Sequence, residues 1–204
     1  TNAAQPNEKI NLAMIGCGKR GHWIAEHFHN HGGYNIIAAA DYFQDRLDSF
    51  GQKYNVPQQN RFTGFSCYQK VLEIENLDAV AILSPPYFHP EQTAAAIDAG
   101  KHVFLAKPIA VDVPGCKSIA QSGEKATQNN LCLLVDFQTR VDPFYQQAVK
   151  KVHYGDIGPI ASGLANYYTA RLELRAKPGT PEAKLKNWVF DKALSGDIIT
   201  EQNI

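Results

Sequence analysis

The stretch Ile10-Asn11-Leu12-Ala13-Met14-Ile15, followed at once by Gly16-Cys17-Gly18-Lys19-Arg20-Gly21, decides the fold of this chain. Six mostly apolar residues predict a buried strand, and the glycines after it fit the pattern G-x-G-x-x-G. The first glycine of this pattern permits a tight turn, the second lets the backbone approach a pyrophosphate, and the third lets helix and strand pack closely. A helix predicted from Gly21 to His29 would direct free N–H groups at the phosphates. The stretch therefore predicts a dinucleotide-binding turn, in which Cys17 supplies a small side chain.

A second apolar run, residues 34–40, ends at Asp41, twenty residues after Gly21. An acidic residue at this spacing can accept hydrogen bonds from both hydroxyls of a ribose. Its charge would also repel a 2′-phosphate, so Asp41 favours NAD as the cofactor. Tyr42 can lie against the adenine or the ribose.

Basic side chains beside these motifs keep NADP open as the alternative cofactor. Lys19 and Arg20 can assist the pyrophosphate or a 2′-phosphate, or can simply be solvated. Arg46 lies one helical turn beyond Tyr42, where it can pair with Asp45 or bind a 2′-phosphate.

Strand and helix signals alternate from Ile10 to Phe137. Apolar runs predict four more strands, at 61–63, 78–83, 102–106 and 131–137. Helical spacing of apolar residues predicts helices at 43–54, near 68–74, at 90–99 and at 113–127. This alternation predicts an α/β fold of the Rossmann type, a doubly wound parallel sheet that binds ligands beyond the carboxyl ends of its strands.

The remainder of the chain predicts the beginning of a second, α+β domain. Residues 142–153 have helical spacing, 160–169 suggest a strand, and 172–186 suggest a mobile connection rich in Lys, Glu and Pro. Short apolar patches follow at 188–190 and 198–199. We therefore divide the chain into a flexible lead-in at 1–8, a dinucleotide-binding domain at 9–140, and a partial second domain at 141–204.

Composition excludes several classes of partner. Twenty basic and twenty acidic side chains cancel, so no nucleic-acid or anionic-membrane partner is indicated, and no apolar run approaches the length of a membrane span. We expect a cytoplasmic protein, with export after removal of an N-terminal signal as the alternative because the chain begins with Thr1.

Metal and disulfide sites have little support in the sequence. The four cysteines form no C-x-x-C pair and are expected to be buried free thiols. His27, His29 and His31 end a predicted helix, where histidines suit the negative end of the helix dipole better than a metal. We predict no metal site.

Several ordered motifs together resemble the glucose-fructose oxidoreductase/inositol dehydrogenase/rhizopine-catabolism (Gfo/Idh/MocA) oxidoreductases. The family's second signature is a strand ending in Thr-Pro-Asn-x-x-His, then Ala-Gly-Lys-His-Val, then Glu-Lys-Pro. Its counterparts here are Ser84-Pro85-Pro86-Tyr87-Phe88-His89, Ala99-Gly100-Lys101-His102-Val103 and Ala106-Lys107-Pro108. Two later stretches also resemble family motifs, Asp136-Phe137-Gln138-Thr139-Arg140 and Gly155-Asp156-Ile157-Gly158-Pro159-Ile160.

The resemblance implies hydride transfer between a nicotinamide cofactor and a sugar, polyol or related hydroxyl-bearing substrate. It implies Lys107 as the residue that handles the substrate proton and contacts the cofactor, with Ser84 and Pro85 beside the cofactor. His89 matches by position, as a cofactor contact or as a structural residue at a helix start. The acidic partner that precedes this lysine in the family is Ala106 here, so that local charge compensation is lost.

The largest departure from the family lies at the end of the chain. There the family has a glycine run and Asp-x-Gly-x-His, whereas this chain has Ser195-Gly196-Asp197 and then Glu201-Gln202-Asn203-Ile204. The resemblance places Glu201 where the family has its catalytic aspartate, and it indicates a truncated member that would form a homo-oligomer at full length. Two alternatives stay open, an NAD-dependent glycosidase on the same fold and a dinucleotide-binding fragment without catalysis.

Overall fold

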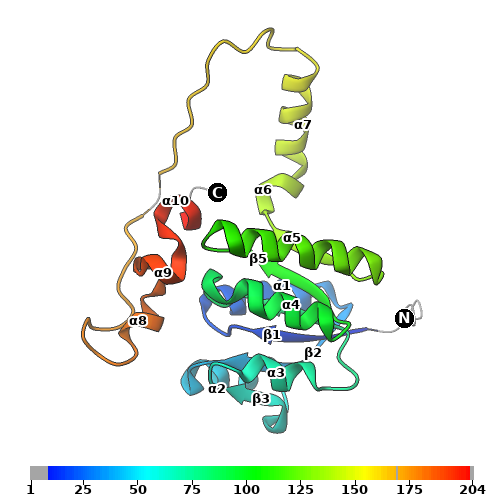
Figure 1. The fold of residues 1–204 in the computed structure, drawn as a ribbon, viewed down its shortest axis with the longest axis vertical. Coiled ribbons are helices and arrows are strands. Elements are labelled where there is room, and N and C mark those ends of the chain that lie inside the picture. Colours follow the sequence, from blue (N-terminus) through cyan, green and yellow to red (C-terminus); the bar gives the residue numbers. More distant parts are fainter. Residues whose placement is uncertain (1–8, 169, 203–204) are drawn as a thin grey trace.

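The computed structural model describes residues 9–168 and 170–202, and its centre is a six-stranded parallel sheet (Figure 1). The predicted lead-in at 1–8 lies outside the described residues. The strands are β1 (Ile10–Ile15), β2 (Tyr34–Asp41), β3 (Arg61–Thr63), β4 (Ala79–Ile82), β5 (His102–Ala106) and β6 (Leu133–Asp136). Their order is β3-β2-β1-β4-β5-β6, so the direction of winding reverses between β1 and β4. The predicted doubly wound Rossmann fold is confirmed.

The register brings the ends of the strands to a common edge. Ile15 pairs with Ala40 on one side and with Ile82 on the other, and Ala106 pairs with Asp136. The loops that follow β1, β2, β4 and β5 therefore leave the sheet together, as expected for a ligand-binding edge.

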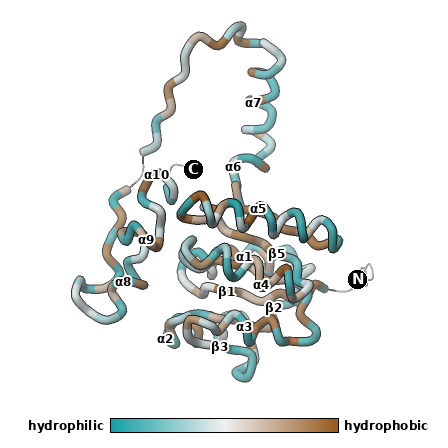
Figure 2. The backbone as a smooth tube through the Cα atoms, viewed as in Figure 1, coloured by the Kyte–Doolittle hydropathy of each residue, from teal (hydrophilic) through white to brown (hydrophobic). Residues whose placement is uncertain are grey.

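Five helices cover the two faces of the sheet: α1 (Lys19–His31), α2 (Gln44–Lys53), α3 (Cys67–Leu72), α4 (His89–Asp98) and α5 (Val113–Gln128). One apolar core packs β1 and β2 against Ile24 of α1 and Phe50 of α2. The other core packs the opposite face against Val71 of α3, Ile97 of α4 and Ile119 of α5. In Figure 2 the helices around the sheet alternate between hydrophilic and hydrophobic colour along their length.

The first helix begins two residues before the predicted start. Gly18 is its N-cap residue, with an extended backbone at φ −74° and ψ −168°, and Gly32 ends it in the left-handed region at φ 79°. The helix therefore opens inside the glycine motif, and its first turn contains Lys19, Arg20 and Gly21.

Beyond the sheet, α6 (Gln138–Val141) and α7 (Pro143–His153) lead into a long extended segment. The strand predicted at 160–169 is wrong for 160–168, which form no strand, while Thr169 lies outside the described residues. A strand is stabilised by hydrogen bonds to a neighbouring strand. All strand pairings within the described ranges are between members of the six-stranded sheet, so residues 160–168 have no strand partner there. Ile160 and Leu164 stay exposed, at 68% and 88%.

The chain then returns to the carboxyl edge of the sheet through α8 (Ala183–Lys186), the 3-10 turn η3 (Trp188–Phe190), α9 (Lys192–Ser195) and α10 (Asp197–Gln202). The α9 helix contacts the 3-10 turn η2 (Pro86–Phe88), which follows β4. The amide of Asn187 fixes the incoming loop, because its Oδ1 accepts from the N–H groups of Arg175 and Ala176 at 2.7 and 3.0 Å. The stretch predicted as a connection therefore ends in a folded segment beside the sheet edge.

Candidate functional site

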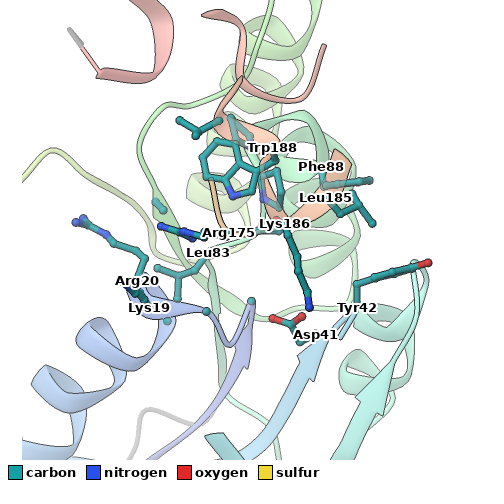
Figure 3. Close-up of a pocket in the computed structure, with 18 of the residues that line it drawn as sticks. Lys19, Arg20, Asp41, Tyr42, Leu83, Phe88, Arg175, Leu185, Lys186 and Trp188 are labelled. Atoms are coloured by element: carbon teal, nitrogen blue, oxygen red, sulfur yellow. The ribbon is translucent and has the colours of Figure 1, made fainter. Parts of the chain in front are cut away.

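A cavity of about 660 Å³ lies between the carboxyl edge of the sheet and the returning C-terminal segment (Figure 3). Its floor comes from the glycine turn and from the residues that follow β2, β4 and β5. Its opposite wall comes from residues 171–175 and 185–189 and from α10. Most of the predicted site residues line it: Gly16, Gly18, Lys19, Arg20, Gly21, Asp41, Tyr42, Arg46, Ser84, Pro85, Lys107 and Glu201.

The three glycines of the turn have different physical reasons to be glycine. Gly16 has φ +102°, and a Cβ there would lie 2.6 Å from the main-chain carbon of Leu83. A Cβ on Gly21 would overlap the carbonyl oxygen of Gly16, so the close packing of helix on strand requires glycine here. A Cβ on Gly18 would meet only the Arg46 guanidinium, at 3.8 Å. Protein packing thus demands two of the glycines, whereas Gly18 leaves open space at the cavity.

Cys17 contributes its backbone to the turn and its side chain to the core. The residue is 1% exposed, and it packs with the apolar residues under α1 and α2. Burial raises the pKa of this thiol well above its usual value, and the nearby Asp41 carboxylate raises it further. The side chain is therefore an unreactive filler. Cys67 is also a buried free thiol, whereas Cys116 and Cys132 are exposed, so the prediction of buried cysteines is wrong for those two.

Asp41 ends β2 with its carboxylate fixed by two backbone amides. Oδ2 accepts from the N–H of Cys17 at 2.7 Å, and Oδ1 accepts from the N–H of Phe43 at 2.9 Å. The side chain is buried, and burial raises its pKa, against the lowering effect of these two hydrogen bonds and of Arg46. The carboxylate is thus held in one orientation at the cavity wall, beside the glycine turn.

Aromatic and cationic side chains form the rim beside Asp41. Tyr42 is half exposed, and its ring lies 4.5 Å from that of Phe65, centroid to centroid. The Arg46 guanidinium lies over the Phe43 ring at 4.7 Å, a cation–π distance. The predicted pair of Arg46 with Asp45 is not formed among the described residues, where the ion-pair partner of Asp45 is Lys186.

Arg20 is engaged with the sheet edge. Its guanidinium forms an ion pair with Asp136 at the end of β6 and lies 4.6 Å from the centroid of the Trp23 ring. A phosphate ligand would have to share or replace Asp136 as its partner. Lys19 lines the cavity in the first turn of α1 and stays a predicted phosphate contact.

The residues after β4 hold the sheet edge together. The Ser84 hydroxyl donates to Oε1 of Gln92 at 2.6 Å, and both residues line the cavity. His89 is fully buried, with Nε2 2.9 Å from the carbonyl oxygen of Ser84 and Nδ1 2.9 Å from that of Pro108. Burial lowers the pKa of His89 to about 4, although both carbonyl contacts act in the opposite direction. His89 thus joins the loops that follow β4 and β5, and this geometry favours its structural role over a cofactor contact.

Lys107, which follows β5, meets Glu201 of α10. Its Nζ donates to the main-chain carbonyl oxygen of Glu201 and lies 3.5 Å from the carboxylate Oε1 of the same residue. Both side chains are largely buried, at 22% and 10% exposed. The sequence indicated a lysine without charge compensation because Ala106 precedes it. In the folded chain a carboxylate 94 residues away occupies that role.

The described residues contain no group of three or more His, Cys, Asp or Glu side chains placed to hold a metal ion. His27 packs edge-on against Trp23, His29 lies beside Tyr54, and His31 beside Tyr34. The same part of the chain also has no helix of the length and apolar character that a membrane crossing requires.

Sequence reasoning missed the wall of the cavity that lies far along the chain. Arg175, Lys186 and Trp188 line it and point into it in Figure 3. Their stretch was predicted as a connection and an unpartnered apolar patch. Its composition gives no sign of the partner surface, and only the fold brings it to the sheet edge.

Comparison with known proteins independently supports the Rossmann fold and the family resemblance. The Gfo/Idh/MocA family model, described as "Oxidoreductase family, NAD-binding Rossmann fold", matches residues 10–137. A glycosyl hydrolase family 109 protein of Shewanella pealeana is 26% identical over 185 residues, 89% of this chain and 39% of that protein. The scyllo-inositol 2-dehydrogenase (NAD(+)) of Bacillus subtilis is 24% identical over 151 residues, 74% of this chain and 42% of that protein.

Solved structures agree with the family match. Myo-inositol 2-dehydrogenase from Lactobacillus plantarum superposes with a TM-score of 0.65 at 31% identity, over 75% of this chain and 43% of that one. Scyllo-inositol dehydrogenase from Lactobacillus casei, solved with NAD(H) and scyllo-inositol, gives 0.62 at 28% identity, over 74% and 43%. The chain spans about two fifths of the length of the curated relatives it matches. On this evidence the chain belongs to the Gfo/Idh/MocA oxidoreductases, a family with an NAD-binding Rossmann fold.

Proposed function

We propose that this chain is the cofactor-binding part of an NAD(P)-dependent oxidoreductase that acts on a polyol or sugar. The observation that carries the proposal is the meeting of Lys107 and Glu201 in the cavity that the glycine turn and Asp41 also line. A proton-transferring pair and a dinucleotide-binding edge thus share one cleft, as hydride transfer to or from a hydroxyl-bearing carbon requires.

The residues present fit a dinucleotide. The space beside Gly18 would be filled by a Cβ, and protein packing does not account for the glycine there. The N-terminus of α1 offers N–H groups without acceptors in the helix, which suits a pyrophosphate. The fixed Asp41 carboxylate suits the hydroxyls of the adenosine ribose, and Tyr42 beside it suits the adenine.

The nicotinamide, when bound, supplies the acceptor or donor of the hydride. On substrate oxidation the carbon–hydrogen bond breaks with both of its electrons, and the hydroxyl proton must leave for a carbonyl to form. We assign the transfer of that proton to Lys107 Nζ. The Glu201 carboxylate would hold the Lys107 side chain in place beside the substrate hydroxyl.

We assign residues 9–140 to the dinucleotide-binding domain and residues 141–204 to part of a substrate and oligomerisation domain. The polyol class is supported by relatives named as inositol dehydrogenases, one of them solved with scyllo-inositol. The match covers 43% of each of these two solved dehydrogenases, so most of each relative lies outside it.

The test is reduction of NAD by the purified chain with a panel of inositols and sugars, followed by the absorbance of reduced nicotinamide. Loss of a general acid or base typically costs about 10²- to 10⁴-fold in rate, so Lys107→Met should lower turnover by that factor, and by far more than it lowers the affinity for NADH. Lys117→Met, at an exposed position of α5, is the matched control and should change neither. Equal turnover by Lys107→Met and the wild type would refute the assignment of Lys107.

A second candidate is an NAD-dependent glycosidase. Its support is the match to glycosyl hydrolase family 109 proteins over 88–89% of this chain. The two activities differ in their use of cofactor, because transient oxidation during glycoside cleavage returns the electrons to the substrate. Release of phenol from aryl glycosides without net formation of NADH would favour the glycosidase. Saturable NADH binding with neither activity would favour a non-catalytic binding module.

A further inference from the structure

Two cations from distant parts of the chain meet at the rim beside Asp41. The guanidinium carbon of Arg46, in α2, lies 4.7 Å from the centroid of the Phe43 ring. The Nζ of Lys186, in α8, lies 5.0 Å from the same centroid. Figure 3 shows the Lys186 side chain running from the C-terminal segment toward Asp41 and Tyr42. The matched part of the family model ends at residue 137, so Lys186 lies outside it.

Lys186 is held at this rim by its own segment. Its N–H donates to the carbonyl of Glu182 at 2.9 Å, and the next residue, Asn187, anchors the preceding loop. The side chain is only 25% exposed. Its one carboxylate neighbour within ion-pair distance among the described residues is Asp45, at 4.0 Å. Asp45 is 71% exposed, and an ion pair that long and that solvated is weak. The ammonium group is therefore positioned at the cavity without a strong partner.

The charges around the rim bear on the choice between the two dinucleotides. Asp41 alone would repel the 2′-phosphate that distinguishes NADP from NAD. The Asp41 carboxylate is held at the end of β2 by two backbone amides. The cationic groups of Arg46 and Lys186 both lie next to the Phe43 ring. A phosphate dianion beside the ribose would meet both cations and could displace the long Asp45 contact.

We propose that Lys186 is a specificity-determining residue that binds the 2′-phosphate of NADP together with Arg46, so that the site accepts NADP as well as NAD. This inference rests on the proposed function to the extent that the cavity must bind a dinucleotide. It does not depend on Lys107 or on any turnover.

The test compares Lys186→Gln with the wild type in equilibrium titrations with NADH and NADPH, and in competition by 2′,5′-ADP and by 5′-AMP. Loss of one charge-assisted hydrogen bond predicts a fall of about tenfold or more in the affinity for NADPH and 2′,5′-ADP. The affinity for NADH and 5′-AMP should change by less than about threefold, since neither ligand carries the 2′-phosphate. Lys186→Arg, which keeps the charge, should retain most of the affinity for NADPH.

The matched control is Lys184→Gln on the same short helix. Lys184 is 67% exposed and pairs with Asp191 at 3.5 Å, away from the rim, so this variant should bind both dinucleotides as the wild type does. An equal loss of NADH and NADPH affinity in Lys186→Gln, or no loss of either, would overturn the inference while leaving the dinucleotide site intact. Absence of binding of either dinucleotide to the wild type would instead overturn the proposed function, and this inference with it.

Discussion

Substitution of single glycines in the turn separates the needs of the fold from those of the ligand. In Gly16→Ala the new Cβ would lie 2.6 Å from the Leu83 main-chain carbon, at a residue whose φ is +102°. Such a backbone conformation alone costs a non-glycine residue about 1–3 kcal/mol, and relief of the overlap adds to it. We expect a loss of about 3 kcal/mol or more, which lowers Tm by about 6–12 °C in a chain of this size.

Gly18→Ala is the matched variant, with a different expected result. Its backbone, at φ −74° and ψ −168°, is open to alanine, and the new Cβ meets only Arg46 at an ordinary contact distance of 3.8 Å. Stability should stay within about 0.5 kcal/mol of the wild type. The methyl group would fill space that the pyrophosphate needs, so NADH affinity should fall about tenfold or more.

Thermal unfolding and NADH fluorescence titration of both variants provide the measurement. The expected pattern is a destabilised Gly16→Ala and a Gly18→Ala that is stable but binds weakly. A Gly18→Ala variant with wild-type affinity would refute the assignment of this turn to the pyrophosphate. A Gly16→Ala variant as stable as the wild type would refute the packing argument.

Three further predictions concern titratable side chains. Burial lowers the pKa of His89 from 6.5 to about 4, so between these two pH values the unfolded chain binds a proton that the folded chain does not. The free energy of unfolding should therefore be unaffected by this histidine above pH 6.5 and should fall by roughly 3 kcal/mol toward pH 4. Urea unfolding across that range checks this, and a His89→Gln variant with the same pH dependence would contradict it. Asp41→Ala should lower the affinity for NADH about tenfold and shift the preference between the two cofactors toward NADPH. It should also lower stability, because the Cys17 and Phe43 amides lose their acceptor. An unchanged ratio of NADH to NADPH affinity in paired titrations would count against the ribose contact. Iodoacetamide should label the exposed Cys116 and Cys132 in the folded chain and reach Cys17 and Cys67 only after unfolding, as peptide mass mapping would reveal; early labelling of Cys17 would contradict its burial.

The sheet and the glycine turn could be predicted because their signals are local. Each strand is a short apolar run, and the glycine spacing lies within the single β1–α1 unit, although the contact that requires Gly16 comes from Leu83, just beyond β4. The same local pattern placed Asp41 at the end of β2, beside the turn. Local signals thus sufficed for the fold class and for one half of the cavity.

The other half of the cavity depends on contacts between distant residues. Nothing in the spacing of the sequence indicates that Lys107 meets the backbone of Glu201, or that Arg20 pairs with Asp136. The strand predicted at 160–169 is wrong over 160–168 for a related reason, since an apolar stretch forms a strand only where another strand pairs with it. Composition described the segment around Lys186 as a connection, whereas its function as a cavity wall comes from its place in the fold.

The most direct test of the central claim is a titration of the Trp23→Phe variant with NADH, followed by quenching of the remaining tryptophan. Trp188 lines the cavity, whereas Trp23 lies outside it, so the variant reports on the cavity alone. We predict saturable quenching of Trp188 with matching growth of reduced-nicotinamide fluorescence, and a shift of both to about tenfold or higher NADH concentrations in Gly18→Ala. Absence of saturable quenching in the folded protein would contradict the assignment of this cavity to a dinucleotide.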